Sequence, residues 1–156
     1  MILPSTDANP PLRLLAAFND LFPRQSPGYI IQATGREMWI AAKSPDASHF
    51  RLHVPDLGHE TVFDWRGAAT KQTLRRRPLP RWARYAAGVI VHLYHQGIDV
   101  AGIDAVIVAA EPPGPRFDFS LGLAFATLWY TINKLEHTED NLLTVVEQVR
   151  REYIEA

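Results

Sequence analysis

The sequence of 156 residues contains no cysteine. This absence excludes disulfide bonds, thiol catalysis and zinc sites with cysteine ligands. It fits the reducing cytoplasm, where we expect the chain to act. An excess of charge of one sign is lacking as well, since 16 Lys and Arg are balanced by 17 Asp and Glu. The formal net charge of −1 does not indicate a strongly basic nucleic-acid binder or an acidic tail.

Long apolar runs and targeting signals are also lacking. The most apolar stretch, residues 119–135, is interrupted by serine, threonine, asparagine and lysine, and it falls short of a good membrane span. The first 20 residues show no early positive cluster followed by an apolar segment, so no targeting peptide is expected. With 47% apolar residues the chain can bury a sizeable core. We therefore expect one soluble domain without membrane association, or one lobe of a larger enzyme.

Three common catalytic and cofactor motifs are missing. The sequence has no G-x-x-x-x-G-K-[ST] phosphate loop, no G-x-G-x-x-G dinucleotide fingerprint and no G-x-S-x-G nucleophile elbow. These absences exclude the signatures, not whole reaction classes.

The apolar periodicity predicts an α+β layout rather than a regular βαβ alternation. Residues 49–54 alternate, with Phe50, Leu52 and Val54 on one side, as in a half-buried antiparallel strand. A hairpin across Thr34 and Gly35 is expected just before it. The predicted order is a helix 9–22, a small antiparallel sheet within 28–65, a basic loop 67–80, a helix 81–96, a buried strand 103–110, a buried helix 119–135 and a helix 138–154.

Local signals set several of these boundaries. Asn9 is expected to cap the first helix, with Pro10 in its first turn, and Thr138 to cap the last one. Gly97 is expected to end the helix that begins at residue 81. The whole chain, residues 1–156, is thus interpreted as a single domain.

Two polar groups were considered as binding sites. His92 and His95 lie three apart on one predicted helix, which permits joint metal ligation, but no acidic partner follows at a matching spacing. We interpret them as polar positions on a helix face and assign no metal ligand. A basic cluster could meet an anionic ligand or nucleic acid; with few aromatics interleaved, a solvated linker is preferred. This cluster comprises Lys71, Arg75, Arg76, Arg77, Arg81 and Arg84.

One segment is more specific. Residues 80–90, PRWARYAAGVI, resemble the P-R-W-A-x-Y-x-x-G-V-I stretch of galactokinases, which belong to the GHMP small-molecule kinases. Residues 98–107 are similar to the strand that follows in that family, G-F-D-x-x-I. Residues 112–126 align without a gap with the family's phosphate-loop motif, P-x-G-x-G-L-S-S-S-A-x-L-x-x-A. The matching positions are Pro112, Gly114, Ser120, Leu123 and Ala126.

The resemblance extends more weakly over residues 15–64, so that it covers nearly the whole chain as the N-terminal half of a galactokinase. It implies the α+β lobe of GHMP kinases, with ATP and Mg²⁺ as cofactors. It also implies that Trp82 lines an adenine site and that Gly114 and Ser120 belong to the phosphate loop. Turn and core roles for Gly114 and Trp82 remain alternatives.

Three motifs of the family are altered or missing. The sugar-binding motif G-R-V-N-L-I-G-E-H-T-D-Y should lie between Phe22 and Tyr29, and it is absent. In the phosphate loop, Arg116 replaces the second glycine, Pro115 removes a donor N–H, and Asp118 and Phe119 replace serines. The segment with the family's catalytic Asp, G-x-M-D-Q, and the C-terminal lobe have no counterpart up to Ala156. No catalytic residue is therefore assigned.

Three hypotheses follow. The first is a non-catalytic galactokinase-like lobe, a pseudoenzyme of carbohydrate metabolism, that binds a nucleotide weakly or binds a protein partner. The second is part of a split or truncated sugar kinase that phosphorylates galactose only with a C-terminal lobe. The third is a structural or interaction module. Because a lone lobe exposes apolar surface, we expect a second lobe, a homodimer or another protein partner.

Overall fold

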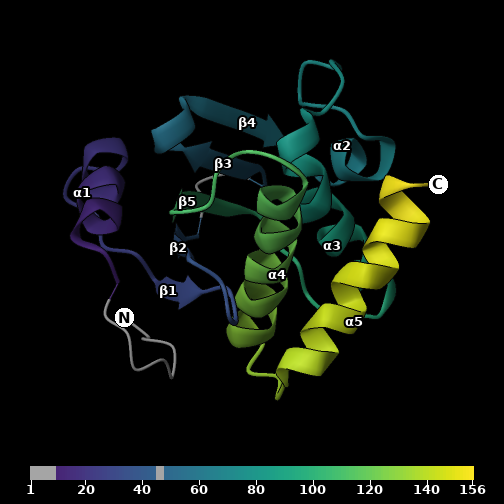
Figure 1. Ribbon diagram of the computed structural model, residues 1–156. Coiled ribbons are helices and arrows are strands. Elements are labelled where there is room, and N and C mark those ends of the chain that lie inside the picture. Colours follow the sequence, from purple (N-terminus) through teal and green to yellow (C-terminus); the bar gives the residue numbers. More distant parts are fainter. Residues whose placement is uncertain (1–9, 45–47) are drawn as a thin grey trace.

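The computed structural model describes residues 10–44 and 48–156. Its centre is one mixed sheet of five strands in the order β1-β2-β5-β3-β4 (Figure 1). The strands are β1 (Tyr29–Gln32), β2 (Met38–Lys43), β3 (Phe50–Val54), β4 (His59–Phe63) and β5 (Ile103–Ala109). The fold is α+β, as the sequence predicted.

The prediction of one antiparallel sheet within residues 28–65 is wrong in its topology. The hairpins β1–β2 and β3–β4 form, but β5 lies between them, antiparallel to β2 and parallel to β3. The reason is burial: residues 103–108 of β5 are all buried, and a strand that is apolar on both sides suits the middle of a sheet. The hairpin across Thr34 and Gly35 is confirmed, with Gln32 opposite Trp39.

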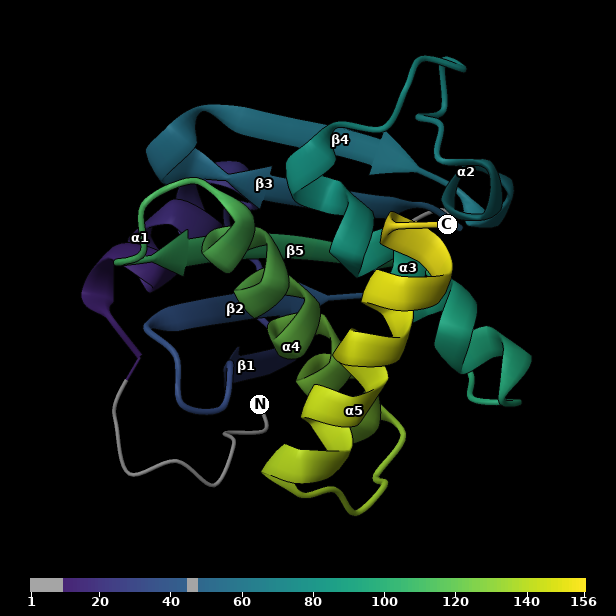
Figure 2. The ribbon, with the colours of Figure 1, turned by 45° about the vertical axis from the view of Figure 1, so that its right-hand side comes forward.

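Helices cover the two faces of the sheet unequally. The helices α3 (Arg84–His95) and α4 (Pro115–Ile132) pack against one face, and α5 (Glu139–Val149) packs on both of them (Figure 2). Among the described residues, α1 (Leu12–Leu21) is the only helix on the other face, where Leu14 and Phe18 belong to a smaller apolar cluster. The main core therefore lies between the sheet and the three-helix layer.

Several helix boundaries differ from the sequence expectations. The helix α4 begins at Pro115 instead of residue 119, because Gly114 adopts a φ of 149° and proline suits the first helical position. Residues 67–80 are not a free loop, since α2 (Trp65–Thr70) occupies the beginning and Asp64 accepts a hydrogen bond from Gly67 N at 2.7 Å. A short 3₁₀ turn, η2 (Arg81–Ala83), precedes α3. The proposed cap Asn9 lies outside the described residues.

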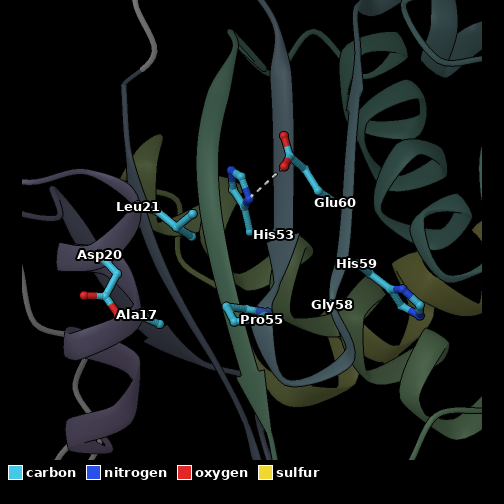
Figure 3. A pocket seen from close by; sticks show the side chains of 8 residues that line it. All are labelled: Ala17, Asp20, Leu21, His53, Pro55, Gly58, His59 and Glu60. Carbon is cyan, nitrogen blue, oxygen red and sulfur yellow. Dashed lines mark ion pairs between the residues drawn. The ribbon is translucent and has the colours of Figure 1, made fainter.

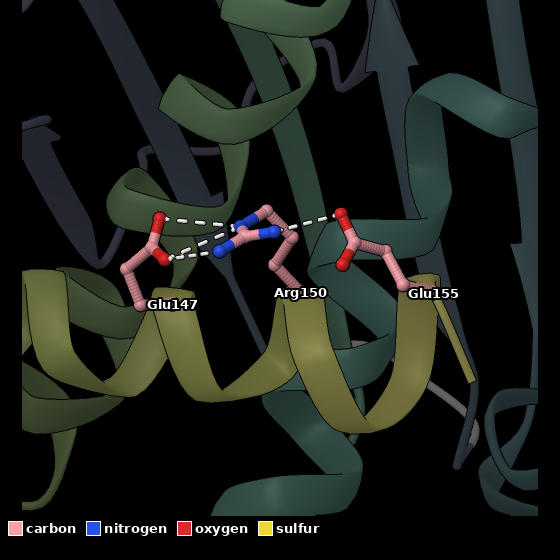
Figure 4. Close-up of polar contacts among 3 residues, drawn as sticks. All are labelled: Glu147, Arg150 and Glu155. Carbon is pink, nitrogen blue, oxygen red and sulfur yellow. Dashed lines mark hydrogen bonds and ion pairs between the residues drawn. The ribbon is translucent and has the colours of Figure 1, made fainter.

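The C-terminal helix is held by a cap and by an ion network. Thr138 caps α5 in a reciprocal capping box with Asn141, as expected. The helix continues as a π-turn, η3 (Arg150–Ile154). Figure 4 shows Arg150 between Glu147 and Glu155, with a nitrogen–oxygen distance of 2.7 Å to each carboxylate. The hydrogen bond from Arg150 lowers the pKa of Glu147, although exposed pairs of this kind add little stability.

No helix within the described residues is long and apolar enough to cross a membrane.

Candidate functional site

The candidate site lies where β5 leads into α4. Ser120, fully buried in the second turn of α4, donates its hydroxyl hydrogen to the carboxylate of Glu111, whose two oxygens both lie 2.9 Å away. Arg36 Nη1, from the β1–β2 turn, donates to the same Ser120 oxygen at 3.3 Å. Arg116 Nε approaches Glu111 to 3.9 Å. The one serine hydroxyl that the resemblance retains is thus occupied by groups of the chain itself.

A second carboxylate is buried in the same region. Asp118 is 6% exposed, and Arg81 Nε of η2 lies 3.5 Å from its Oδ2 atom. Burial raises the pKa of Asp118, and the positive charge of Arg81 lowers it in part. A cavity of about 300 Å³ opens beside this pair. It is lined by Arg81, Arg84, Tyr85, Pro115, Asp118 and Ile154.

The tryptophan predicted to line an adenine site directly follows Arg81 in η2, but Trp82 is not among the described residues that line this cavity. Trp82 is half-buried in η2, which contacts α4. The imidazole of His59 stacks on its ring at 5.6 Å between centroids, with the planes inclined by 12°. One face of the indole is therefore covered by another side chain of the chain.

The structure brings Trp82, Gly114 and Ser120 to one end of the three-helix layer. Gly114 starts α4, and a Cβ atom at this position would meet no atom within 4 Å. Its positive φ, and not a close approach of another group, is what demands glycine here. The sequence did not indicate Glu111 and Arg36. Arg36 lies 84 positions from Ser120, and no local pattern marks that contact.

A second cavity, also of about 300 Å³, lies between α1 and the β3–β4 hairpin. In Figure 3, His53 and Glu60 point toward each other across neighbouring strands, whereas His59 points away. His53 Nδ1 lies 3.6 Å from Glu60 Oε2. Burial lowers the pKa of His53, and the negative charge of Glu60 raises it in part.

The described part of the chain contains no cluster of side chains suited to bind a metal ion. Within residues 10–44 and 48–156, no three His, Asp or Glu side chains come together in a way that could hold a metal ion. His92, considered above with His95, has a pKa lowered by burial, an effect that Glu152 partly offsets.

Comparisons with known proteins find similarity in structure only. No protein-family model matches the sequence, and no curated protein matches it. The galactokinase of Lactococcus lactis, solved with galactose, superposes over 93% of this chain at 18% identity with a TM-score of 0.67. A mevalonate kinase superposes over 76% of the chain with a TM-score of 0.58, and that of Methanococcus jannaschii over 74% with a TM-score of 0.57, both at 14% identity.

The chain spans less than half of these proteins: 43% of the galactokinase and 38% and 36% of the two mevalonate kinases. It therefore has the α+β fold of a partial GHMP kinase lobe, as the resemblance in its sequence predicted.

Proposed function

We propose that this chain is a GHMP-kinase-like lobe that does not transfer phosphate by itself and acts by binding a partner. The observation that carries the proposal is the occupation of the first turns of α4 by buried carboxylates of the chain. Glu111 holds the Ser120 hydroxyl, and Asp118 lies where the resemblance implies a serine hydroxyl.

The residues present fit a triphosphate poorly. A helix N-terminus binds phosphate through free N–H groups and a favourable dipole. Here Pro115 contributes no N–H group, and Asp118 and Glu111 add negative charge. Two like charges at about 4 Å cost on the order of 4 kcal/mol at a near-surface effective dielectric. Arg81 and Arg116 already pair with these carboxylates, so phosphate would have to compete for both cations.

The adenine side of the site supports the same proposal. A base that stacks on Trp82 has to use the face opposite His59 or displace the imidazole. Base stacking on an aromatic ring contributes only about 1–3 kcal/mol. This gain is smaller than the repulsion at the phosphates, which is on the order of 4 kcal/mol, and a base that displaces the imidazole also loses the His59 contact.

The test is thermal unfolding with and without 10 mM Mg-ATP. We expect no saturable shift in Tm, whereas a ligand at about 100 times its Kd would stabilise the chain by roughly 2.7 kcal/mol. The double variant Glu111→Gln/Asp118→Ser removes both carboxylates and should gain a shift that Trp82→Ala then abolishes. A saturable shift in the unmodified chain that is lost in Trp82→Ala would overturn the proposal.

The binding role rests on exposed apolar side chains. Leu12 is 84% exposed on α1, and Leu15, three positions later, is also exposed. We propose a second lobe, another copy of the chain or a different protein as the partner. Light scattering at increasing protein concentration tests self-association. A monomer that binds no apolar dye would argue against an unpartnered surface.

A split sugar kinase is the second candidate, and the 93% coverage of this chain against 43% of the galactokinase favours it. In that case a separate polypeptide carries the C-terminal lobe. Mixing the two should then produce ATP-dependent phosphorylation of galactose, with ADP release as the readout. Binding of the second polypeptide without ADP release would leave the non-catalytic proposal in place.

A further inference from the structure

A third cavity, of about 530 Å³, lies beside β4, which is the edge strand opposite β1 in the sheet. It shares no lining residue with the cavity at α4. The residues that matter to its chemistry come from β3 and the residue before it, from β4, and from the loop after α2. They are His49, Arg51, Glu60, Val62, Thr73 and Arg75.

Strand alternation and one backbone contact build this cavity. Arg51 and Val62 are register partners, and they face away from the main core, in which the neighbouring pair of Phe50 and Phe63 stacks. Leu74 N donates to Val62 O at 3.0 Å, which holds the loop against the edge of β4. Figure 2 shows this loop projecting beyond the sheet next to α2.

The positive charges of the cavity have no partner in the described part of the chain. Arg51 and Arg75 form no ion pair within residues 10–44 and 48–156, and the buried Nε of Arg51 has no hydrogen-bond acceptor there. Among the described residues that line the cavity, Glu60 is the only acid, and its Oε2 atom lies 3.6 Å from Nδ1 of His53. Buried donors are normally satisfied, so the unpartnered Nε–H of Arg51 favours an anionic ligand at this position.

We propose that this cavity binds a small organic phosphate, with the phosphate against Arg51 and Arg75. Guanidinium groups match the geometry of phosphate oxygens. The Thr73 hydroxyl accepts from Arg77 N at 3.3 Å, which leaves its hydrogen free to donate. Val62 and Leu74 offer apolar surface to the organic part of the ligand. A volume of this size suits a small molecule.

A small molecule is favoured over nucleic acid because, among the described lining residues, His49 is the only aromatic one. Binding of single strands depends on aromatic rings that stack on bases, together with a groove of positive charge. The chain as a whole carries a net charge of −1.

The test is an NMR titration of the ¹⁵N-labelled chain with inorganic phosphate and with glycerol 3-phosphate, at constant ionic strength set by chloride. We expect saturable shifts at residues 49–51, 60–62 and 73–75, and tighter binding of glycerol 3-phosphate. Arg75→Gln, at an exposed position, should weaken binding at least fivefold, and Arg51→Gln should do the same. Arg77→Gln, which removes the same charge two positions away and lies outside the lining, should change Kd less than twofold.

Three results would overturn the proposal: shifts that do not saturate, equal losses in Arg75→Gln and Arg77→Gln, or shifts confined to the first turn of α4. Salt-dependent binding of a single-stranded RNA without saturable binding of either phosphate would overturn it as well. Because the two cavities share no residue, this outcome is independent of the Mg-ATP test.

Discussion

The carboxylate of Asp118 is a buried charge with one exposed partner. Among the described residues its only ion pair is with Arg81, whose side chain is 74% exposed. Burial dominates and raises the pKa of Asp118, so the folded chain holds the proton more tightly than the unfolded chain does. At neutral pH this carboxylate is therefore ionised at a cost to stability.

Asp118→Asn should stabilise the chain at pH 7. We expect a rise in Tm of about 2–4 °C, which corresponds to ~1 kcal/mol for a chain of this size. The gain should shrink as the pH is lowered toward the ordinary aspartate value of 3.8, because the protonated Asp118 then resembles the amide. Calorimetry of the unmodified chain and of Asp118→Asn between pH 3 and pH 8 measures this difference in Tm. A constant difference in Tm across this range would show that burial of the charge is not the cause.

At the scale of elements, α3 approaches the C-terminal helix closely at Gly88. A Cβ atom added there would lie 2.5 Å from Val149 Cγ1 and 2.8 Å from Tyr153 Cδ1. Tyr153 cannot easily move aside, because its hydroxyl donates to Ala68 O at 2.6 Å. The contact between α3 and the end of α5 thus depends on the absence of a side chain at this one position.

Gly88→Ala should therefore lower the stability of the chain. Overpacking costs about 1–3 kcal/mol, and the better helix propensity of alanine returns only about 1 kcal/mol. We expect Tm to fall by several degrees in calorimetry. Gly122→Ala is the matched control in α4, where the added Cβ would meet Tyr85 and Val146 at 3.1 Å and should cost less. Equal effects of the two substitutions would contradict the packing argument.

Elements defined by local signals were predictable from the sequence, whereas those defined by distant partners were not. The cap at Thr138 depends on neighbours within a few positions, and it is found. Phe50, Leu52 and Val54 share the core side of β3 as predicted, but the strand is not half-buried, because His53 on its other side is also buried. The place of β5 between two hairpins depends on strands more than 50 positions away, and the prediction missed it.

The residues of the candidate site also differ in whether a local pattern or a distant contact defines them. The resemblance indicated Gly114 and Ser120, because the phosphate-loop motif is a contiguous segment. It did not indicate that Glu111 and Arg36 converge on Ser120, since the second contact joins the β1–β2 turn to α4. The start of α4 at Pro115 was missed because the apolar pattern begins only at Phe117, after the proline and Arg116.

At the scale of the whole molecule, the sheet has two cores of unequal size. The face under α3, α4 and α5 carries the main apolar cluster, whereas α1 contributes Leu14 and Phe18 to a separate, smaller cluster on the other face. Within the described part of the chain, the polar contacts that hold α1 are also few. Arg13 forms an exposed ion pair with Asp56 and donates to Ala109 O at 3.1 Å. Regions with little buried apolar surface open at lower free energy than the rest of a protein.

The amides of α1 should therefore exchange with solvent through a partial opening that leaves the other face intact. Native-state hydrogen exchange at increasing denaturant measures the free energy of each opening. We expect the amides of residues 16–21 to open at lower free energy and with weaker denaturant dependence than those of β5 and α4. Added salt should lower the protection of α1 alone, because it screens the exposed pair of Arg13 and Asp56. If α1 and β5 converge on one exchange isotherm at all denaturant concentrations, the two cores unfold together and the smaller one has no independent stability.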